Sequence, residues 1–102
     1  MDDIDLQDLR NAALEASRAF AEKSLKKSEF IPGKSAVPVS GKVLDADDLV
    51  ALVDSSLDGW LTAGRFTRDF ERELAKFVGA RSALFVNSGS SANLVALSGL
   101  SS

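Results

Sequence analysis

The sequence predicts an α/β fold that opens with helices and reaches a single strand, loop and helix. Several segments repeat apolar residues at helical spacing between recognisable cap residues. One short, continuous apolar run at residues 83–86 is typical of a strand covered on both faces. A serine- and glycine-rich turn then leads into another apolar helix. Because each parallel neighbour of that strand needs a further crossover, we expect the sheet to be incomplete within these 102 residues.

The composition is that of a globular protein and excludes several classes. The chain is 45% hydrophobic and 26% charged, which argues against disorder and collagen-like repeats. Its 12 basic and 15 acidic side chains favour neither nucleic acid nor an anionic membrane as a partner. No apolar run reaches the roughly 18 residues of a membrane span, and the start has no secretory pattern, so we expect a cytoplasmic location. Cysteine and histidine are both absent, and we assign no metal ligand and no catalytic residue.

The first predicted helix covers residues 2–27. Acidic residues crowd its start and lysines its end, which suits the helix dipole. Its expected apolar stripe, at steps of three or four, consists of Leu6, Leu9, Ala13, Ala16, Phe20 and Leu25. The stripe predicts either a surface helix packed on the body or an oligomer contact.

An extended connector follows at residues 30–42 and contains both prolines. Pro32-Gly33 predicts a turn, and Pro38 keeps its neighbour extended. We place the one internal boundary here, with an N-terminal helix and arm at 1–42 and the start of the main α/β domain at 43–102.

Two further helices have clear end signals. Asp45 is the expected N-cap of the second, with Asp48 at the capping-box position and Gly59 as a left-handed stop. The third runs from about Thr67 to Val78 and ends at Gly79.

The predicted strand, residues 81–87, leads into the turn that carries the most chemistry. A helix N-terminus offers unpaired N–H groups and a partial positive charge, which together attract anions. Gly89 permits close approach of a phosphate, and Ser88, Ser90 and Ser91 supply hydroxyl donors. Neither the Walker pattern nor the dinucleotide-binding pattern is present. The alternative is that Ser88 or Ser90 only caps the helix.

Four blocks of sequence resemble the N-terminal region of the DegT/DnrJ/EryC1/StrS family. They are WLTAG at 60–64, FERELA at 70–75, FVGA at 77–80 and VNSGSSANL at 86–94. Most members carry Ser-Gly-Thr-x-Ala-Leu in the last block, where this chain has Ser-Gly-Ser-Ser-Ala-Asn-Leu. This variant, with DGWLT and the VPVSGK connector, is most similar to the RfbH-like branch of CDP-4-keto-6-deoxyglucose 3-dehydrases of lipopolysaccharide biosynthesis.

The resemblance implies a fold-type-I large domain, like that of aspartate aminotransferase, beginning at residue 43. It implies that Gly89, Ser90 and Ser91 cradle the 5′-phosphate of pyridoxal or pyridoxamine phosphate. It also places residues 60–65 near a nucleotide-linked 4-keto-6-deoxy sugar, so that Trp60, Thr62 and Arg65 become candidate substrate residues. The alternatives are an interface anchor for Trp60 and a solvated charge for Arg65.

The resemblance also implies elements that these residues do not contain. The family's Schiff-base lysine, the histidine that replaces it in the dehydrase branch, and the cysteines of a [2Fe-2S] cluster have no counterpart here. We therefore expect an N-terminal piece of a larger homodimeric enzyme, served by a reductase partner and inactive by itself. Three functions stay open: part of a pyridoxamine-phosphate-dependent sugar dehydrase, part of a sugar aminotransferase, or a non-catalytic helical interaction module.

Overall fold

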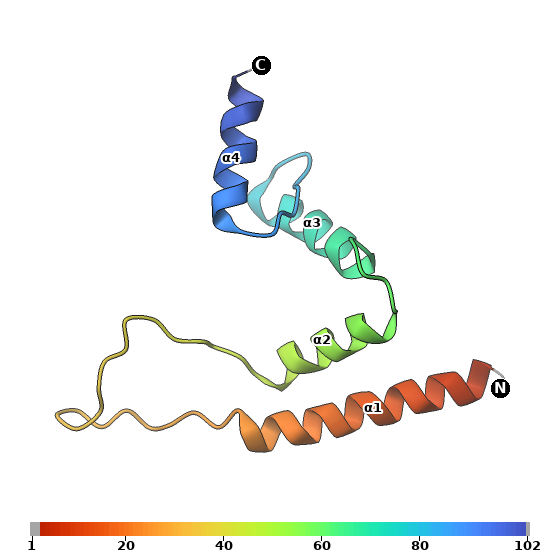
Figure 1. The fold of residues 1–102 in the computed structure, drawn as a ribbon, viewed down its shortest axis with the longest axis vertical. Helices are drawn as coiled ribbons and strands as arrows, with labels where there is room; N and C mark the ends of the chain where they lie inside the picture. Colours follow the sequence, from red (N-terminus) through yellow and green to blue (C-terminus); the bar gives the residue numbers. More distant parts are fainter. Residues whose placement is uncertain (1–2, 102) are drawn as a thin grey trace. The chain divides into compact units, whose positions relative to one another are not determined.

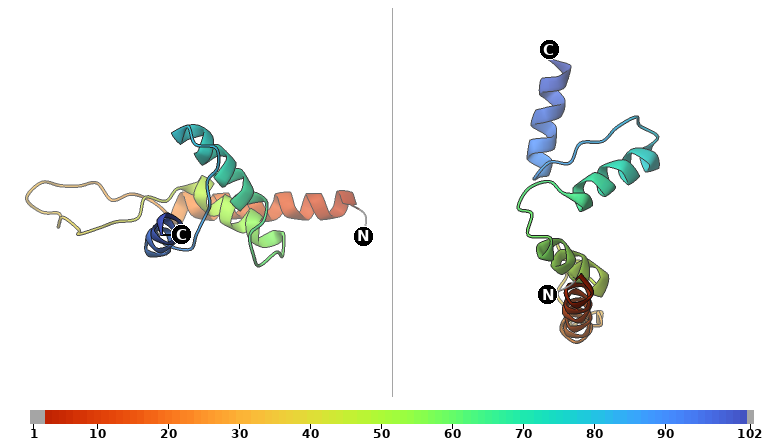
Figure 2. Two further views of the ribbon diagram at one scale, coloured as in Figure 1. Left: turned by 90° about the horizontal axis from the view of Figure 1, so that it is seen from above. Right: turned by 90° about the vertical axis from the view of Figure 1, so that its right-hand side faces the viewer.

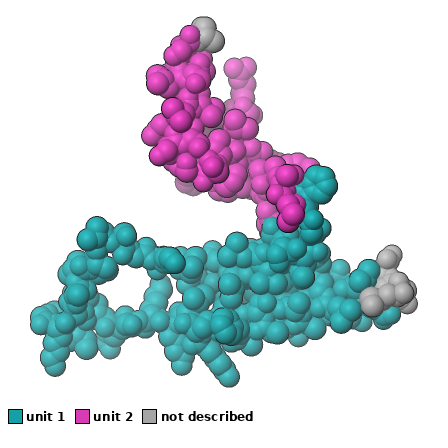
Figure 3. Space-filling model, viewed as in Figure 1, with its two compact units in different colours: residues 1–60 teal, residues 61–102 magenta. Residues whose placement is uncertain are grey.

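A computed structural model describes residues 3–101 of the chain. It contains two compact units, Met1–Trp60 and Leu61–Ser102 (Figure 3). Over the described range the secondary structure consists of four α-helices, without a strand (Figure 1).

The first unit is a pair of antiparallel helices, α1 (Asp3–Ser24) and α2 (Ala46–Leu57), that lie side by side (Figures 1 and 2). The less exposed residues of α1 form one face, at helical spacing, that consists of Arg10, Ala13, Leu14, Ser17 and Ala21. Ala21 is buried, with 1% of its surface exposed. Three of these five side chains are small, which lets the two backbones approach closely.

The expected apolar stripe of α1 is largely not the packed face. Leu6, Leu9 and Phe20 keep 56%, 57% and 67% of their surface exposed. These large side chains are therefore not covered within this unit, and the choice between packing on the body and an oligomer contact stays a prediction. The half-buried Leu14, by contrast, was not part of that stripe. Helical periodicity identified an apolar side of the helix, but α2 packs against the adjacent side, where most side chains are small.

Helix α2 begins and ends as its sequence predicts. The Asp45 side chain accepts a hydrogen bond from the Asp48 N–H at 3.0 Å, and the Asp48 side chain accepts one from the Asp45 N–H at 2.9 Å. This reciprocal pair is the capping box. At the other end Gly59 adopts a left-handed φ of 65°, and its N–H donates to the Ser56 carbonyl.

The connector between α1 and α2 has no regular secondary structure, as predicted for its two prolines. Its turn is closed by hydrogen bonds from the Lys34 and Ser35 N–H groups to the Ile31 carbonyl, at 3.1 and 2.8 Å. Gly33 takes the left-handed position, with a φ of 81°.

The second unit contains α3 (Arg65–Val78) and α4 (Gly89–Leu100). Helix α3 begins two residues before the predicted start and ends at Gly79, where φ is 71°. The Gly79 and Ala80 N–H groups donate to the carbonyls of Lys76 and Ala75, which is the Schellman arrangement.

The strand predicted at residues 81–87 is not formed, and this corrects the strand-loop-helix part of the expected fold. Residues 82–86 have no regular secondary structure. A strand exists only when a neighbour pairs with its backbone, and the described residues provide no such neighbour. The apolar run is present, but the sheet that would make it a strand is not.

Both units leave most of their large apolar side chains accessible. Among the described residues, the buried apolar ones are Ala21 and Ala75. Helix α4 carries no charged residue, and Leu94, Val95, Leu97 and Leu100 are all exposed. An uncharged helix with large apolar side chains spread around it is typical of the interior of a larger domain. None of the described helices combines the length and the apolarity needed to cross a membrane.

Candidate functional site

The candidate phosphate loop is the first turn of α4. Ser88 is the N-cap in extended conformation, and its hydroxyl oxygen accepts a hydrogen bond from the Ser91 N–H at 3.1 Å. The same hydroxyl lies 3.1 Å from the Ser91 Oγ, to which it donates. The Ser88 carbonyl accepts the first intrahelical bond from the Ala92 N–H at 3.0 Å. The capping role expected for Ser88 or Ser90 therefore belongs to Ser88.

Two backbone donors in this turn remain available for a ligand. Within the described part of the chain, the N–H groups of Gly89 and Ser90 have no acceptor. Both residues are exposed, and the space that a Cβ of Gly89 would occupy has no neighbour within 4 Å. Since Gly89 does not have a positive φ, the backbone here is unstrained.

The donor set of this turn fits a phosphate group. The two free N–H groups lie at the positive end of the α4 dipole. The Ser90 hydroxyl adds a third donor, and the Ser91 hydroxyl, which accepts from Ser88, keeps its own proton for a ligand. The absence of a side chain on Gly89 leaves the approach open.

The candidate substrate residues lie on the segment that precedes α3. Trp60, the last residue of the first unit, is 67% exposed. In the second unit, Thr62 lies in a bend and Arg65 is the first residue of α3. The Arg65 guanidinium stacks over the Phe66 ring, with its Cζ 4.2 Å from the ring centroid. Gly89, Ser90 and Ser91 thus share one turn, whereas the three substrate candidates are spread along a separate segment.

Glu71 also contacts the segment that leads into the candidate phosphate loop, and no sequence pattern predicted this contact. Its carboxylate accepts a hydrogen bond from the Phe85 N–H at 2.8 Å, in the segment that leads into α4. The rings of Phe70 and Phe85 meet edge to face, with centroids 5.6 Å apart. An acidic residue next to an apolar one on an amphipathic helix usually indicates a solvated face, so the pattern gave no signal for this contact.

Metal binding has no support in the described residues. No cluster of three or more acidic, histidine or cysteine side chains is arranged to hold an ion there.

Comparison with known proteins identifies the family. The model of the DegT/DnrJ/EryC1/StrS aminotransferase family matches residues 43–101. The lipopolysaccharide biosynthesis protein RfbH of Salmonella typhimurium is 46% identical over 94 residues, which is 92% of this chain. A dTDP-4-dehydro-2,6-dideoxy-D-glucose 3-dehydratase of Saccharopolyspora spinosa is 53% identical over 73 residues, or 72% of the chain. The spore coat polysaccharide biosynthesis protein SpsC of Bacillus subtilis is 35% identical over 72 residues, or 71% of the chain.

The chain spans only 22%, 16% and 17% of the respective lengths of these three relatives. The family match nevertheless covers more than half of the chain and includes the whole of α2, α3 and α4. The chain therefore belongs to the DegT/DnrJ/EryC1/StrS aminotransferase family.

Proposed function

We propose that this chain forms the first part of a pyridoxamine-phosphate-dependent nucleotide-sugar 3-dehydrase and supplies its cofactor-phosphate loop. The observation that carries the proposal is the pair of unpartnered N–H groups of Gly89 and Ser90 at the start of α4, inside the region matched by the family model. Two relatives support the reaction class, since one is named a sugar 3-dehydratase and the other a lipopolysaccharide biosynthesis protein.

The phosphate loop binds through charge and shape. The Gly89 and Ser90 N–H groups and the hydroxyls of Ser90 and Ser91 donate to the phosphate oxygens, while Ser88 keeps the turn closed. When bound, pyridoxamine phosphate would supply the amine that condenses with the 4-keto group, and a conjugated ring that takes up the electron pair left by deprotonation of its amine-bearing carbon and releases it as the C3 hydroxyl departs. In the complete fold-type-I domain, residues 82–86 become a strand once neighbouring strands pair with them.

The segment before α3 is the proposed substrate side. Arg65 pairs with the diphosphate of a nucleotide-linked 4-keto-6-deoxy sugar, because its guanidinium, held over the Phe66 ring, offers a planar set of N–H donors that suits phosphate oxygens. Thr62 donates a hydrogen bond, and Trp60 offers an exposed aromatic surface to the sugar or the base. The proposal also includes a homodimer, a reductase partner and a cytoplasmic location. It further includes a [2Fe-2S] cluster whose ligands lie beyond these residues.

A second candidate is an aminotransferase acting on the same class of sugar, because the matching family model carries that name. The non-catalytic interaction module, the third alternative, loses support with membership of a family of aminotransferases. The two enzymatic candidates differ in the fate of the C3 hydroxyl and in the residue at the Schiff-base position.

The test uses the full-length protein encoded by the reading frame that contains these residues. It is incubated with a nucleotide-linked 4-keto-6-deoxy sugar, once with pyridoxamine phosphate and a reductase system, and once with pyridoxal phosphate and glutamate. We expect loss of the C3 hydroxyl in the first reaction. Amino-sugar formation in the second, without C3 dehydration in the first, would favour the aminotransferase instead.

A further inference from the structure

Helix α3 contacts Phe85, in the segment that enters the phosphate loop, in two ways. The Glu71 carboxylate accepts the Phe85 N–H at 2.8 Å, and the Phe70 ring meets the Phe85 ring at 82°, with centroids 5.6 Å apart. One contact holds the backbone and the other holds the side chain. Glu71 is partly exposed and Phe85 is 53% exposed, so the edge-to-face ring contact supports a hydrogen bond that solvent can reach.

This contact is the main polar restraint on the segment. Of the backbone donors in residues 81–87, all of which the structure describes, the Phe85 N–H is the one with an acceptor in the chain. Among the described residues no ladder holds the segment, and in the complete domain strand pairing would add to the contact with Glu71. The Gly79 cap fixes the point where the chain leaves α3. The next hydrogen bond that holds the backbone is the one from the Phe85 N–H to the Glu71 carboxylate.

The restraint lies close to the phosphate donors in sequence. Phe85 precedes the N-cap Ser88 by three residues, and Gly89 and Ser90 follow that cap directly. Two residues, Val86 and Asn87, connect Phe85 to Ser88 at the start of α4, so the position of Phe85 limits where the helix can begin. Ligand-binding groups must be held to within about 0.5 Å of their productive geometry to bind well.

We propose that Glu71 is a positioning residue for the cofactor phosphate. By holding Phe85, it sets where Ser88 starts α4 and hence where the Gly89 and Ser90 N–H groups lie. The role rests on the proposed function for its ligand, but the anchoring of α4 by Glu71 can be measured without that ligand.

The test compares three variants of the full-length protein. Glu71→Ala removes the acceptor, Glu71→Gln keeps an acceptor oxygen of the same reach, and Glu73→Ala is the matched control. Glu73 lies on the same helix and pairs only with exposed Arg72 and Lys76. Pyridoxamine phosphate is titrated against each variant well below its melting temperature, and amide exchange is measured without the cofactor.

Glu71→Ala should weaken pyridoxamine phosphate binding about two- to tenfold, the range of one net hydrogen bond. It should also speed exchange at Phe85 and at Ser91 and Ala92, whose N–H groups bond to the Ser88 cap. Glu71→Gln should restore both properties to within about twofold of the wild type. Glu73→Ala should change neither.

Three results would overturn the inference. The first is an unchanged affinity in Glu71→Ala despite faster exchange at Phe85. The second is a Glu71→Gln variant as impaired as Glu71→Ala. If the wild type binds no pyridoxamine phosphate, the proposed function fails, and the exchange data still decide about Glu71. The third result that would overturn the inference is an unchanged rate of amide exchange at Ser91 and Ala92 in Glu71→Ala.

Discussion

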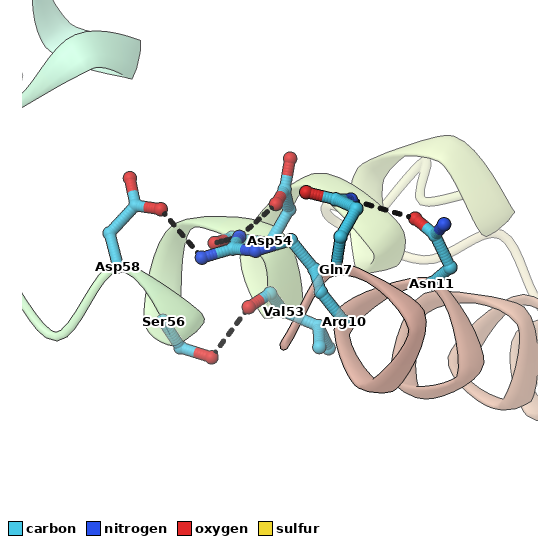
Figure 4. Close-up of polar contacts among 7 residues, drawn as sticks. All are labelled: Gln7, Arg10, Asn11, Val53, Asp54, Ser56 and Asp58. Atoms are coloured by element: carbon cyan, nitrogen blue, oxygen red, sulfur yellow. Dashed lines mark hydrogen bonds and ion pairs between the residues drawn. The ribbon is translucent and has the colours of Figure 1, made fainter. Parts of the chain in front are cut away.

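The Arg10 guanidinium of α1 donates to both the side chain and the backbone carbonyl of Asp54 in α2 (Figure 4). Its second terminal nitrogen donates to the Asp58 carboxylate at 3.2 Å. Arg10 thus links α1 to the last turn of α2, where a cation also suits the helix dipole. Asp58 precedes the candidate substrate residue Trp60 by two positions. This cluster therefore ties the N-terminal helix to the start of the proposed substrate segment.

Replacing Arg10 should loosen the end of α2. The Arg10 and Asp54 side chains are 26% and 24% exposed, so Arg10→Ala breaks a partly buried pair and leaves two carboxylates without this partner. We expect a loss of about 1–2 kcal/mol in the local stability of α2, between a surface pair and a fully buried one. Native-state amide exchange of the full-length protein, followed in the last turn of α2, measures this loss.

Arg18 provides the matched control for Arg10. It lies on the same helix and pairs with Asp47 at 2.8 Å, but the two side chains are 44% and 81% exposed. Arg18→Ala should therefore cost about 0.5 kcal/mol or less. Equal losses of local stability in Arg10→Ala and Arg18→Ala would show that the lower exposure of the Arg10 cluster does not increase its contribution to stability.

The capping box of α2 gives a second prediction. Asp45→Ala removes the acceptor for the Asp48 N–H and should lower the local stability of α2 by about 1 kcal/mol. Asp45→Asn keeps an oxygen acceptor and should retain most of that stability. Exchange in the first turn of α2 reports the difference. Equal protection in Asp45→Ala and the wild type would contradict the capping role.

Features fixed by neighbouring residues were predictable from the sequence. Asp45 with Asp48, Gly59 and Gly79 were each identified by type and spacing, because caps and left-handed stops depend on a few adjacent residues. A helix after the serine- and glycine-rich turn was also predicted, but its cap was left open between Ser88 and Ser90, and the structure assigns it to Ser88.

Features fixed by distant contacts were not predictable in this way. The packed face of α1 is chosen by α2, which lies more than twenty residues away in the sequence, and not by the size of Leu6 or Phe20. The strand at 81–87 requires neighbours that the described residues do not supply. In the site, the Gly-Ser turn could be identified locally, but the contact of Glu71 with Phe85 spans fourteen residues and had no local signal.

The exposed apolar surface predicts how the 102 residues behave without the rest of a domain. Phe77, Leu97 and Leu100 are 88%, 64% and 86% exposed, and α4 has no charged side chain to face water. We expect the isolated residues to self-associate at micromolar concentration and to bind a dye such as ANS. Analytical ultracentrifugation tests the first point. A stable monomer without dye binding would show that these surfaces need no cover.

The isolated 102 residues should also lack catalytic activity. They contain no histidine, and none of their residues can be assigned the role of the family's Schiff-base lysine. Conversion of a nucleotide-linked keto sugar, with pyridoxamine phosphate added, should not exceed that of a heat-inactivated sample. Clear turnover would mean that the catalytic groups lie among these residues.

The last prediction separates capping from phosphate binding in the first turn of α4. In the full-length protein, Ser88→Ala should cost about 1 kcal/mol of stability because the Ser91 N–H loses its acceptor. Ser90→Ala removes a hydroxyl without a structural role and should leave the melting temperature unchanged. It should weaken pyridoxamine phosphate binding about 10- to 100-fold, as expected for one lost hydrogen bond to a charged group.

Substitutions of Gly89 test whether phosphate binding depends on an open approach to the backbone of this turn. The φ of Gly89 is not left-handed and a Cβ there meets no atom within 4 Å, so Gly89→Ala should fold normally. A bulkier Gly89→Val side chain should obstruct the approach of the phosphate and weaken binding more than Ser90→Ala does. Titration of pyridoxamine phosphate, with melting followed in parallel, measures both effects. If Ser90→Ala and Gly89→Val both bind the cofactor as tightly as the wild type, the first turn of α4 does not hold the phosphate, and Ser88 serves only as a helix cap.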